Sequence, residues 1–298
     1  MGSIPITRST LARSVLAIIA AMVSIQTGAA IAKSLFPALT PAGTTTLRLA
    51  LATVLLLIVL RPWRNLRWLR RAPTLRVLVL YGCALGAMNL LYYIALRGLP
   101  LGVAVAIEFA GPLAVAVWNS RRTIDFAWIA LAVVGLATLL PWHPAAAPLP
   151  TLALLAAFGS AAAWAAYIVS GQRLGRDAPD KASGSVALGM VVATVVAAPV
   201  GIATGGAALL DTQWLPAAFA VALLSSAIPY PLEMKAMQRL PAHTFGVLMS
   251  LEPAIAALAG WLLLEERLTG TQWLAVGSII TASAGAAATA RSAEAARC

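Results

Sequence analysis

Three ionisable side chains stand inside long apolar stretches of the sequence, and they are the residues best placed to do chemistry. Arg48 lies in LRLALATVLLLIVL, Glu108 in VAVAIEFAGPLAVA and Glu252 in VLMSLEPAIAALAG. A charged side chain at the centre of a membrane helix costs roughly 2.5 to 3.5 kcal/mol to insert, so such residues are retained where they face the protein interior and serve a function. Glu108 and Glu252 are also the candidates for binding and releasing a proton.

Arg48 and Glu108 lie at similar depths in their apolar stretches. Each follows about six or seven residues after the start of its stretch, which places both roughly 10 Å below the same surface. The sequence therefore predicts a buried pair of Arg48 and Glu108. In the alternative interpretation, Arg48 extends its head group outward to water and only supports packing.

A proline follows each buried carboxylate at short distance. Pro112 has no N–H to donate to the carbonyl of Glu108, and Pro253 has none for the carbonyl of Met249. We expect a helix break in each half of the chain, with a carbonyl that can hold an ammonium group. The alternative is a simple kink whose backbone groups are satisfied by neighbouring hydroxyls.

Polar and aromatic side chains within the apolar stretches supply the remaining candidates for substrate binding. Trp164 and Tyr167 share one face of their helix, because residues three apart are neighbours on a helix. Such residues also serve as packing material between helices. The candidates are Gln26, Asn89, Tyr92, Tyr93, Trp164 and Tyr167.

Enzymatic chemistry has no support in the sequence. His143, His243 and Cys83 stand in separate segments, so no nucleophile with a base and an orienting group can be assembled from them. No phosphate-binding loop and no metal-ligand spacing is present, and we expect no cofactor. Glu233 is followed closely by Lys235, which favours an interfacial ion pair over a functional carboxylate.

The elements that carry these residues are membrane helices. The 298 residues are 61% hydrophobic and 10% charged, against about 25% charged residues in a soluble domain. Apolar runs of roughly 17 to 25 residues, long enough to span a bilayer, recur along the whole chain. The expected spans are 14–33, 42–60, 77–96, 101–118, 126–141, 151–171, 182–204, 215–235, 243–262 and 271–290.

The basic residues fix the orientation of these ten spans. The net charge is +11, and nearly all of the 21 lysines and arginines fall in alternate connecting segments and at the two chain ends. Lys33, Arg97 and Arg267 fall on the opposite side. This bias follows the positive-inside rule, so both termini are predicted to be cytoplasmic and the charge needs no nucleic acid to explain it. The first span, with Ala30 and Ala32 near its end, also resembles a cleavable signal peptide.

An internal repeat argues for keeping that first span. RGLPLGVAVAIEFAGPLAVA from Arg97 aligns without a gap with QRLPAHTFGVLMSLEPAIAA from Gln238, so that Pro112 matches Pro253. The match predicts two halves, 14–141 and 151–290, of five helices each. Because five is odd, the second half is inverted in the membrane, as in secondary transporters that bind substrate between their repeats.

At this level of detail the chain resembles the EamA-type branch of the drug/metabolite transporter superfamily, and within it a subgroup of bacterial amino-acid exporters. The resemblance covers nearly the full length, with SIQTGAAIAKSLFP from Ser24, LRLAL from Leu47, PLGVAVAIEFAGPLAVA from Pro100, SRRTIDF from Ser120, AAYIVSGQR from Ala165 and PYPLEMKAMQRLPAHTFGVLMSLEPAIAA from Pro229. The subgroup has the same residue types at Gln26, Lys33, Arg48, Asn89, Glu108, Gln172, Glu233 and Glu252. Thr27 departs from it, standing where the subgroup has glycine.

The resemblance implies a multi-pass protein of the bacterial inner membrane that exports threonine, homoserine and related small amino acids. One cation and two carboxylates suit a zwitterion. In the resulting hypothesis Arg48 engages the substrate carboxylate or holds Glu108, the Glu252 region receives the ammonium, and Asn89 or Gln26 reads the side-chain hydroxyl. The sequence does not decide between this exporter, a broad-specificity metabolite or drug exporter and an uncoupled facilitator, nor between a monomer and a homodimer.

Overall fold

The computed structural model describes residues 8–65, 72–118, 123–139, 150–177, 182–229, 232 and 248–295, and every regular element in these ranges is a helix. Glu233, Lys235 and His243 lie outside the described residues. In chain order the elements are α1 (Arg8–Ser34), α2 (Phe36–Leu39), α3 (Pro41–Leu60), η1 (Pro62–Asn65), α4 (Ala72–Leu96), α5 (Leu101–Glu108), α6 (Ala110–Trp118), α7 (Thr123–Leu139), α8 (Thr151–Asp177), α9 (Ala182–Gly205), η4 (Gly206–Leu210), η5 (Thr212–Trp214), α10 (Leu215–Ala222), η6 (Leu223–Ala227), α13 (Glu252–Leu264) and α14 (Gly270–Ala295). The predicted all-α class is confirmed for this part of the chain.

Five of the described helical segments are long and apolar enough to cross a membrane. They are Val15–Ser34, Pro41–Leu60, Pro73–Leu96, Thr151–Gly175 and Gly184–Leu210, and each contains most of one predicted span. Shorter apolar helices cover Leu101–Val115, Phe126–Gly135 and Glu252–Leu264. The chain is therefore a multi-pass membrane protein.

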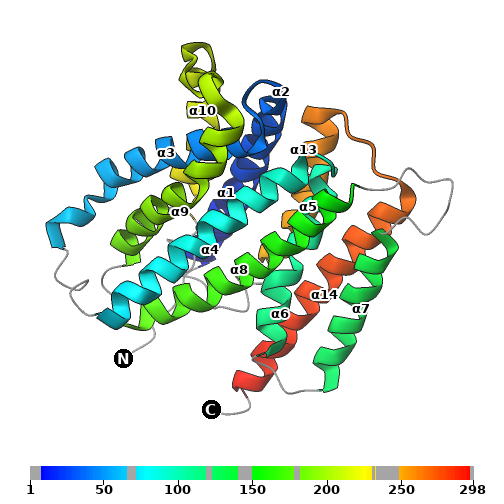
Figure 1. Cartoon of the computed structure of the whole chain (residues 1–298). Helices are drawn as coiled ribbons and strands as arrows, with labels where there is room; N and C mark the ends of the chain where they lie inside the picture. Colours follow the sequence, from blue (N-terminus) through cyan, green and yellow to red (C-terminus); the bar gives the residue numbers. More distant parts are fainter. Residues whose placement is uncertain are drawn as a thin grey trace.

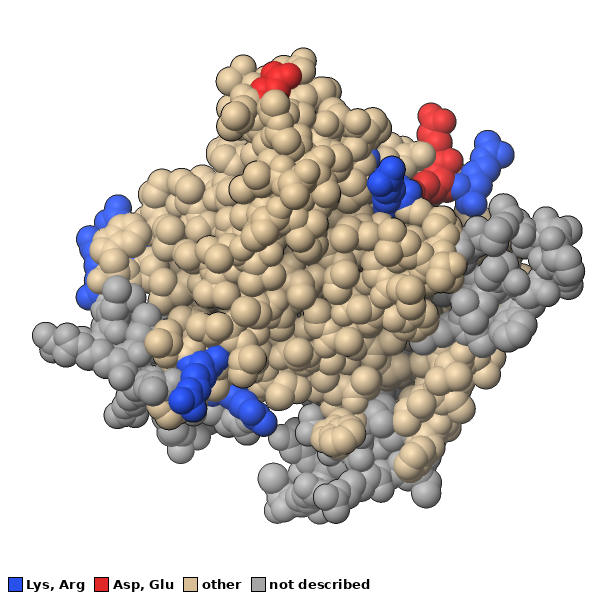
Figure 2. All heavy atoms as spheres, viewed as in Figure 1, with Lys and Arg blue, Asp and Glu red and all other residues tan. Residues whose placement is uncertain are grey.

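The surface has the character expected of a lipid-facing one. Large apolar side chains are exposed all along the helices, among them Val59, Phe126, Leu152 and Leu274. On the face shown in Figure 2 the charged side chains gather at two opposite rims, and the broad band between the rims carries none. Exposed apolar surface on this scale marks contact with a membrane rather than with water.

The helices pack in pairs that join distant parts of the sequence. α3 lies along α9, α4 along α8 and α9, α5 on α13, and α7 on α14 (Figure 1). α1 contacts α10, η6 and α13. Each of these pairs joins a helix from the first half of the chain to one from the second, so the interior of the bundle is built from both.

Two predicted spans are interrupted rather than continuous. The span 101–118 consists of α5 and α6, which meet at Phe109 just before Pro112. The span 243–262 has a turn at Ser250 and Leu251, after which α13 begins with Pro253 in its first turn. Both breaks fall where the prolines predicted them, because proline cannot donate within a helix interior but is tolerated in a first turn.

The glycines Gly82 and Gly86 let α4 and α9 touch backbone to backbone. A Cβ on Gly86 would lie 2.9 Å from the Cα of Ala193, and one on Gly82 would lie 2.8 Å from the carbonyl oxygen of Gly189. The sequence GxxxG predicts such close packing between membrane helices, and the structure confirms it.

Gly86→Ala should therefore lower the melting temperature of the purified protein. Forcing one extra carbon into this contact costs about 1 to 3 kcal/mol, more than the helix propensity of alanine returns. Gly277→Ala on α14 is the matched control, because a Cβ at Gly277 meets no atom within 4 Å among the described residues. Thermal unfolding in detergent would contradict this reasoning if the Gly86 variant were as stable as the Gly277 variant.

Candidate functional site

All nine residues predicted to bind substrate line one cavity of about 110 Å³ inside the bundle. They come from α1, α3, α4, α5, α8 and α13, so both halves of the chain contribute. The other lining residues, none of which the sequence predicts to bind substrate, are Ile25, Ala29, Met88, Ser225 and Met249. Arg48, Glu108 and Glu252 share this cavity and are 4%, 8% and 6% exposed.

Arg48 is held by two residues of α4. Its guanidinium donates to Asn89 Oδ1 and lies over the ring of Tyr93, with Cζ 4.8 Å from the ring centroid. Asn89 Nδ2 in turn donates to the carbonyl oxygen of Leu85 at 2.8 Å, which fixes the orientation of the amide. A neutral amide and an aromatic face position the cation without neutralising it, so its charge remains available to an anion.

The predicted ion pair of Arg48 with Glu108 is wrong. Glu108 is hydrogen-bonded to Ser160 of α8, while Arg48 is hydrogen-bonded to Asn89. The only ion pair between described residues joins Lys33 to Glu266. The alternative in which Arg48 extends outward to water is also wrong, since Arg48 is buried.

Glu108 and Ser160 share a hydrogen-bond arrangement that bears on protonation. Ser160 Oγ lies 2.9 Å from the carbonyl oxygen of Met88 and also contacts Glu108 Oε1. A hydroxyl has one proton, and a carbonyl oxygen accepts only. With Glu108 ionised, Ser160 must share its one proton between the two oxygens; with Glu108 protonated, the carboxyl can donate to Ser160 while Ser160 donates to Met88, so both contacts are full hydrogen bonds.

Glu252 has a different environment at the first residue of α13. Its Oε1 accepts a hydrogen bond of 3.1 Å from Gln26 Nε2 of α1. Within the described ranges, Glu252 Oε2 and Gln26 Oε1 have no hydrogen-bond partner. A carboxylate in the first turn is favoured by the helix dipole. Since both residues line the cavity, these two oxygens are acceptors available to a ligand there.

Aromatic rings form much of the remaining wall. Trp164 meets Phe109 edge to face at 5.3 Å, and Tyr167 stacks on Tyr81 at 4.7 Å with their hydroxyls 3.1 Å apart. Trp164 and Tyr167 do share a face of α8, as their spacing predicted. The hydroxyls of Tyr92 and Tyr93 are buried without a partner among the described residues.

A polar contact joins the end of α1 to two helix connections. Lys33 Nζ lies 2.6 Å from Glu266 Oε1 and donates to the carbonyl oxygen of Leu99 at 2.6 Å. Glu266 Oε2 accepts from the backbone N–H of Leu101 at 2.7 Å, at the start of α5. The pair thus ties α1 to the connections between α4 and α5 and between α13 and α14.

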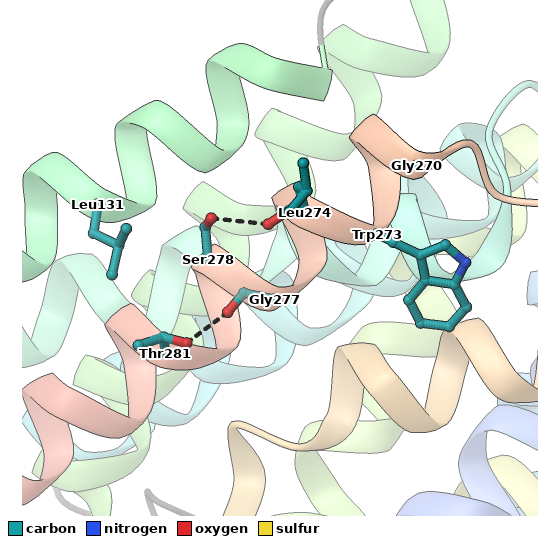
Figure 3. A pocket seen from close by; sticks show the side chains of 7 residues that line it. All are labelled: Leu131, Gly270, Trp273, Leu274, Gly277, Ser278 and Thr281. Atoms are coloured by element: carbon teal, nitrogen blue, oxygen red, sulfur yellow. Dashed lines mark hydrogen bonds between the residues drawn. The ribbon is translucent and has the colours of Figure 1, made fainter.

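A larger hollow of about 470 Å³ lies elsewhere, between α7 and α14 (Figure 3). Its polar side chains, Ser278 and Thr281, turn back and donate to their own helix at the carbonyl oxygens of Leu274 and Gly277, both at 2.8 Å. No charged residue is among its lining. The smaller cavity is therefore the candidate functional site, because it alone of the two gathers charges and unpartnered polar atoms.

Ser160 and Ser225 are the polar site residues that sequence reasoning missed. Ser160 had a usable signal, since it precedes Trp164 by four residues and so shares its helix face. Ser225 had none, because it lies on the π-helical turn η6, for which the sequence carries no known pattern. Neither serine is ionisable, and both stand among small apolar residues.

Comparison with known proteins then decides the family. The profile of the EamA-like transporter family matches residues 151–287. The threonine/homoserine exporter RhtA of Escherichia coli (strain K12) is 47% identical over 275 residues, which are 92% of this chain and 91% of that protein. The chain belongs to the EamA-like transporter family. It is accordingly a transporter and not an enzyme.

A second exporter and a solved structure are also similar to this chain. The threonine/homoserine exporter RhtA of Salmonella typhimurium (strain LT2) is 47% identical over 278 residues, which cover 93% of this EamA-like chain and 92% of the relative. A protein solved by crystallography superposes with a TM-score of 0.61 at 20% identity, over 94% of this chain and 99% of its own. At that identity the likeness shows the fold alone.

Proposed function

We propose that this EamA-like transporter exports small hydroxylated amino acids, such as threonine and homoserine, across the bacterial cytoplasmic membrane by alternating access driven by the proton gradient. The observation that carries the proposal is the cavity that holds Arg48 and Glu252 on its wall, each with polar atoms free to bind. The names of the 47% identical relatives supply the substrate class.

The proposed architecture is ten membrane helices in two inverted halves, 14–141 and 151–290, with both termini in the cytoplasm. The helix pairs support it, since α3 with α9, α5 with α13 and α7 with α14 each join one predicted span to its counterpart five spans later. The breaks support it too, because Phe109 and Ser250 hold matching places in the aligned repeat. A site between inverted repeats is typical of secondary transporters.

The charges of the cavity suit a zwitterion. The carboxylate of the substrate binds the Arg48 guanidinium, and its ammonium binds Glu252 Oε2 and Gln26 Oε1, which are buried acceptors without a partner in the described part of the chain.

The size of the cavity favours an amino acid over a drug. Sites for drug-sized ligands are about 300 to 1,000 Å³, whereas this cavity is about 110 Å³. This is the specific observation that counts against a broad-specificity drug exporter.

Glu108 is the proposed proton carrier. Its contacts through Ser160 are complete in the protonated form, and it lies within electrostatic range of both Arg48 and Glu252. Release of its proton leaves two carboxylates facing one cation, which biases the protein toward another conformation or toward taking up an ammonium. A buried carboxyl that can bind and release a proton therefore favours a proton-coupled exporter over an uncoupled facilitator.

Efflux from proteoliposomes tests the function. Vesicles loaded with labelled threonine, homoserine or leucine are diluted with and without an imposed proton gradient. We expect faster efflux of the first two than of leucine, acceleration by the gradient, and loss of that acceleration on adding a protonophore. Equal efflux of all three would support a broad exporter, and efflux indifferent to the gradient would support a facilitator.

A further inference from the structure

We propose that Ser225, presented on the π-helical turn η6, is the residue that reads the side-chain hydroxyl of the substrate; this rests on the proposed export of hydroxylated amino acids. Ser225 lines the cavity, is 3% exposed, and its Oγ has no hydrogen-bond partner among the residues that the structure describes. A buried hydroxyl without a partner has lost its hydrogen bonds to water and gained none in return. A ligand that bonds to it is therefore favoured over a similar ligand that cannot.

Asn89 and Gln26, which the sequence suggests for recognition of the substrate hydroxyl, are hydrogen-bonded to other groups. Asn89 accepts from Arg48 and donates to the carbonyl oxygen of Leu85. Gln26 donates to Glu252, and its free oxygen lies beside the carboxylate that receives the ammonium. Each amide thus serves to position a charged group of the site.

The unpartnered hydroxyl of Ser225 coincides with the π-turn. Serine and threonine in membrane helices usually donate to the carbonyl oxygen four residues earlier. Thr45, Ser170 and Thr194 all do so in this chain, to Pro41, Ala166 and Met190. In η6 the backbone bond runs instead from Ile228 N to the carbonyl oxygen of Leu223, and Ser225 makes no such bond. π-turns within α-helices occur frequently at functional sites.

Helix α1 holds this turn rigidly in place. Ser24 Oγ donates to the carbonyl oxygen of Leu224 at 2.7 Å, and a Cβ on Gly28 would lie 3.0 Å from the backbone nitrogen of Ser225. α1 also carries Gln26. The hydroxyl reader and the ammonium site are therefore fixed to the same helix.

A second free hydroxyl stands near Ser225. The Tyr93 hydroxyl, also without a partner in the described ranges, lies close to Ser225 on the wall that carries Arg48. A substrate hydroxyl both donates and accepts, so it can bond to Ser225 and Tyr93 together. A substrate with a methyl group there can bond to neither hydroxyl.

The test compares threonine and homoserine with 2-aminobutyrate, which is either substrate without its hydroxyl. Proteoliposomes of wild type and Ser225→Ala are loaded with each compound in turn. In wild type we expect efflux of the hydroxylated pair to exceed that of 2-aminobutyrate. In Ser225→Ala the ratio should fall about tenfold, with efflux of 2-aminobutyrate retained, as expected for one lost hydrogen bond.

Ser226→Ala is the matched control. Ser226 is on the same turn, 0% exposed and without a described partner, yet it does not line the cavity. Its variant should keep the wild-type ratio. A ratio unchanged in Ser225→Ala, an equal loss of all three effluxes, or the same ratio change in both variants would overturn the proposal. Wild-type protein that moves threonine and 2-aminobutyrate equally refutes the hydroxyl reader alone, whereas wild type that moves neither refutes amino-acid export itself.

Discussion

Arg48→Met is expected to reduce threonine efflux from proteoliposomes at least about 100-fold, because removing one partner of a buried charge pair costs about 3 to 5 kcal/mol. In the structure Arg48 is the one cation among the described residues that line the cavity. Without it, the carboxylate of the substrate would enter a buried space that already holds Glu252 and would meet no positive charge.

Arg48→Lys separates charge from shape. Lysine keeps the charge, but its single ammonium group cannot make all three contacts of the arginine at once. These are the hydrogen bond to Asn89, the contact with the Tyr93 ring and the two parallel hydrogen bonds to a carboxylate. We expect its efflux to fall roughly tenfold, between wild type and Arg48→Met. Arg76→Met, which removes an exposed arginine of α4, should transport like wild type and controls for insertion and folding. An Arg48→Met protein that is correctly inserted and exports threonine normally would remove Arg48 from the site.

The sequence predicts which residues form the site, but it does not predict which hydrogen-bond partners those residues have. Ionisable residues in apolar stretches must face the interior, so Arg48, Glu108 and Glu252 were expected to meet. Counting residues along a helix gives depth but not the direction in which the side chain points. Arg48 and Glu108 were placed at similar depth, yet Asn89 and Ser160 are the partners that each one finds.

The helix breaks were likewise predictable from the sequence, whereas the π-turn was not. Pro112 and Pro253 predict the breaks at Phe109 and Ser250, because the missing N–H is a property of proline itself. The π-turn at Leu223 depends on how α1 packs against that segment, through Ser24 and Gly28. No local sequence property encodes such a contact between residues about 200 positions apart.

Variants of Glu108 and Glu252 should behave differently in two assays, threonine exchange without a gradient and efflux driven by a proton gradient. In Glu108→Gln, exchange of threonine without a gradient should stay within about threefold of wild type, because the glutamine amide can donate to Ser160 as a protonated carboxyl does. Acceleration of efflux by a proton gradient should be lost, since glutamine carries no exchangeable charge.

Glu252→Gln should fail in both assays. Its Oε2 is the proposed acceptor for the ammonium, and a neutral amide there leaves the ammonium of the bound substrate without a counter-charge, because the substrate carboxylate is bound to Arg48. We expect exchange to fall at least about 100-fold, the cost of an unpaired buried charge. Glu265→Gln, an exposed carboxylate just after α13, is the matched control and should leave both assays unchanged. If instead Glu252→Gln exchanged normally while Glu108→Gln lost exchange, the roles of ammonium acceptor and proton carrier would have to be reversed, since each assay isolates one of them.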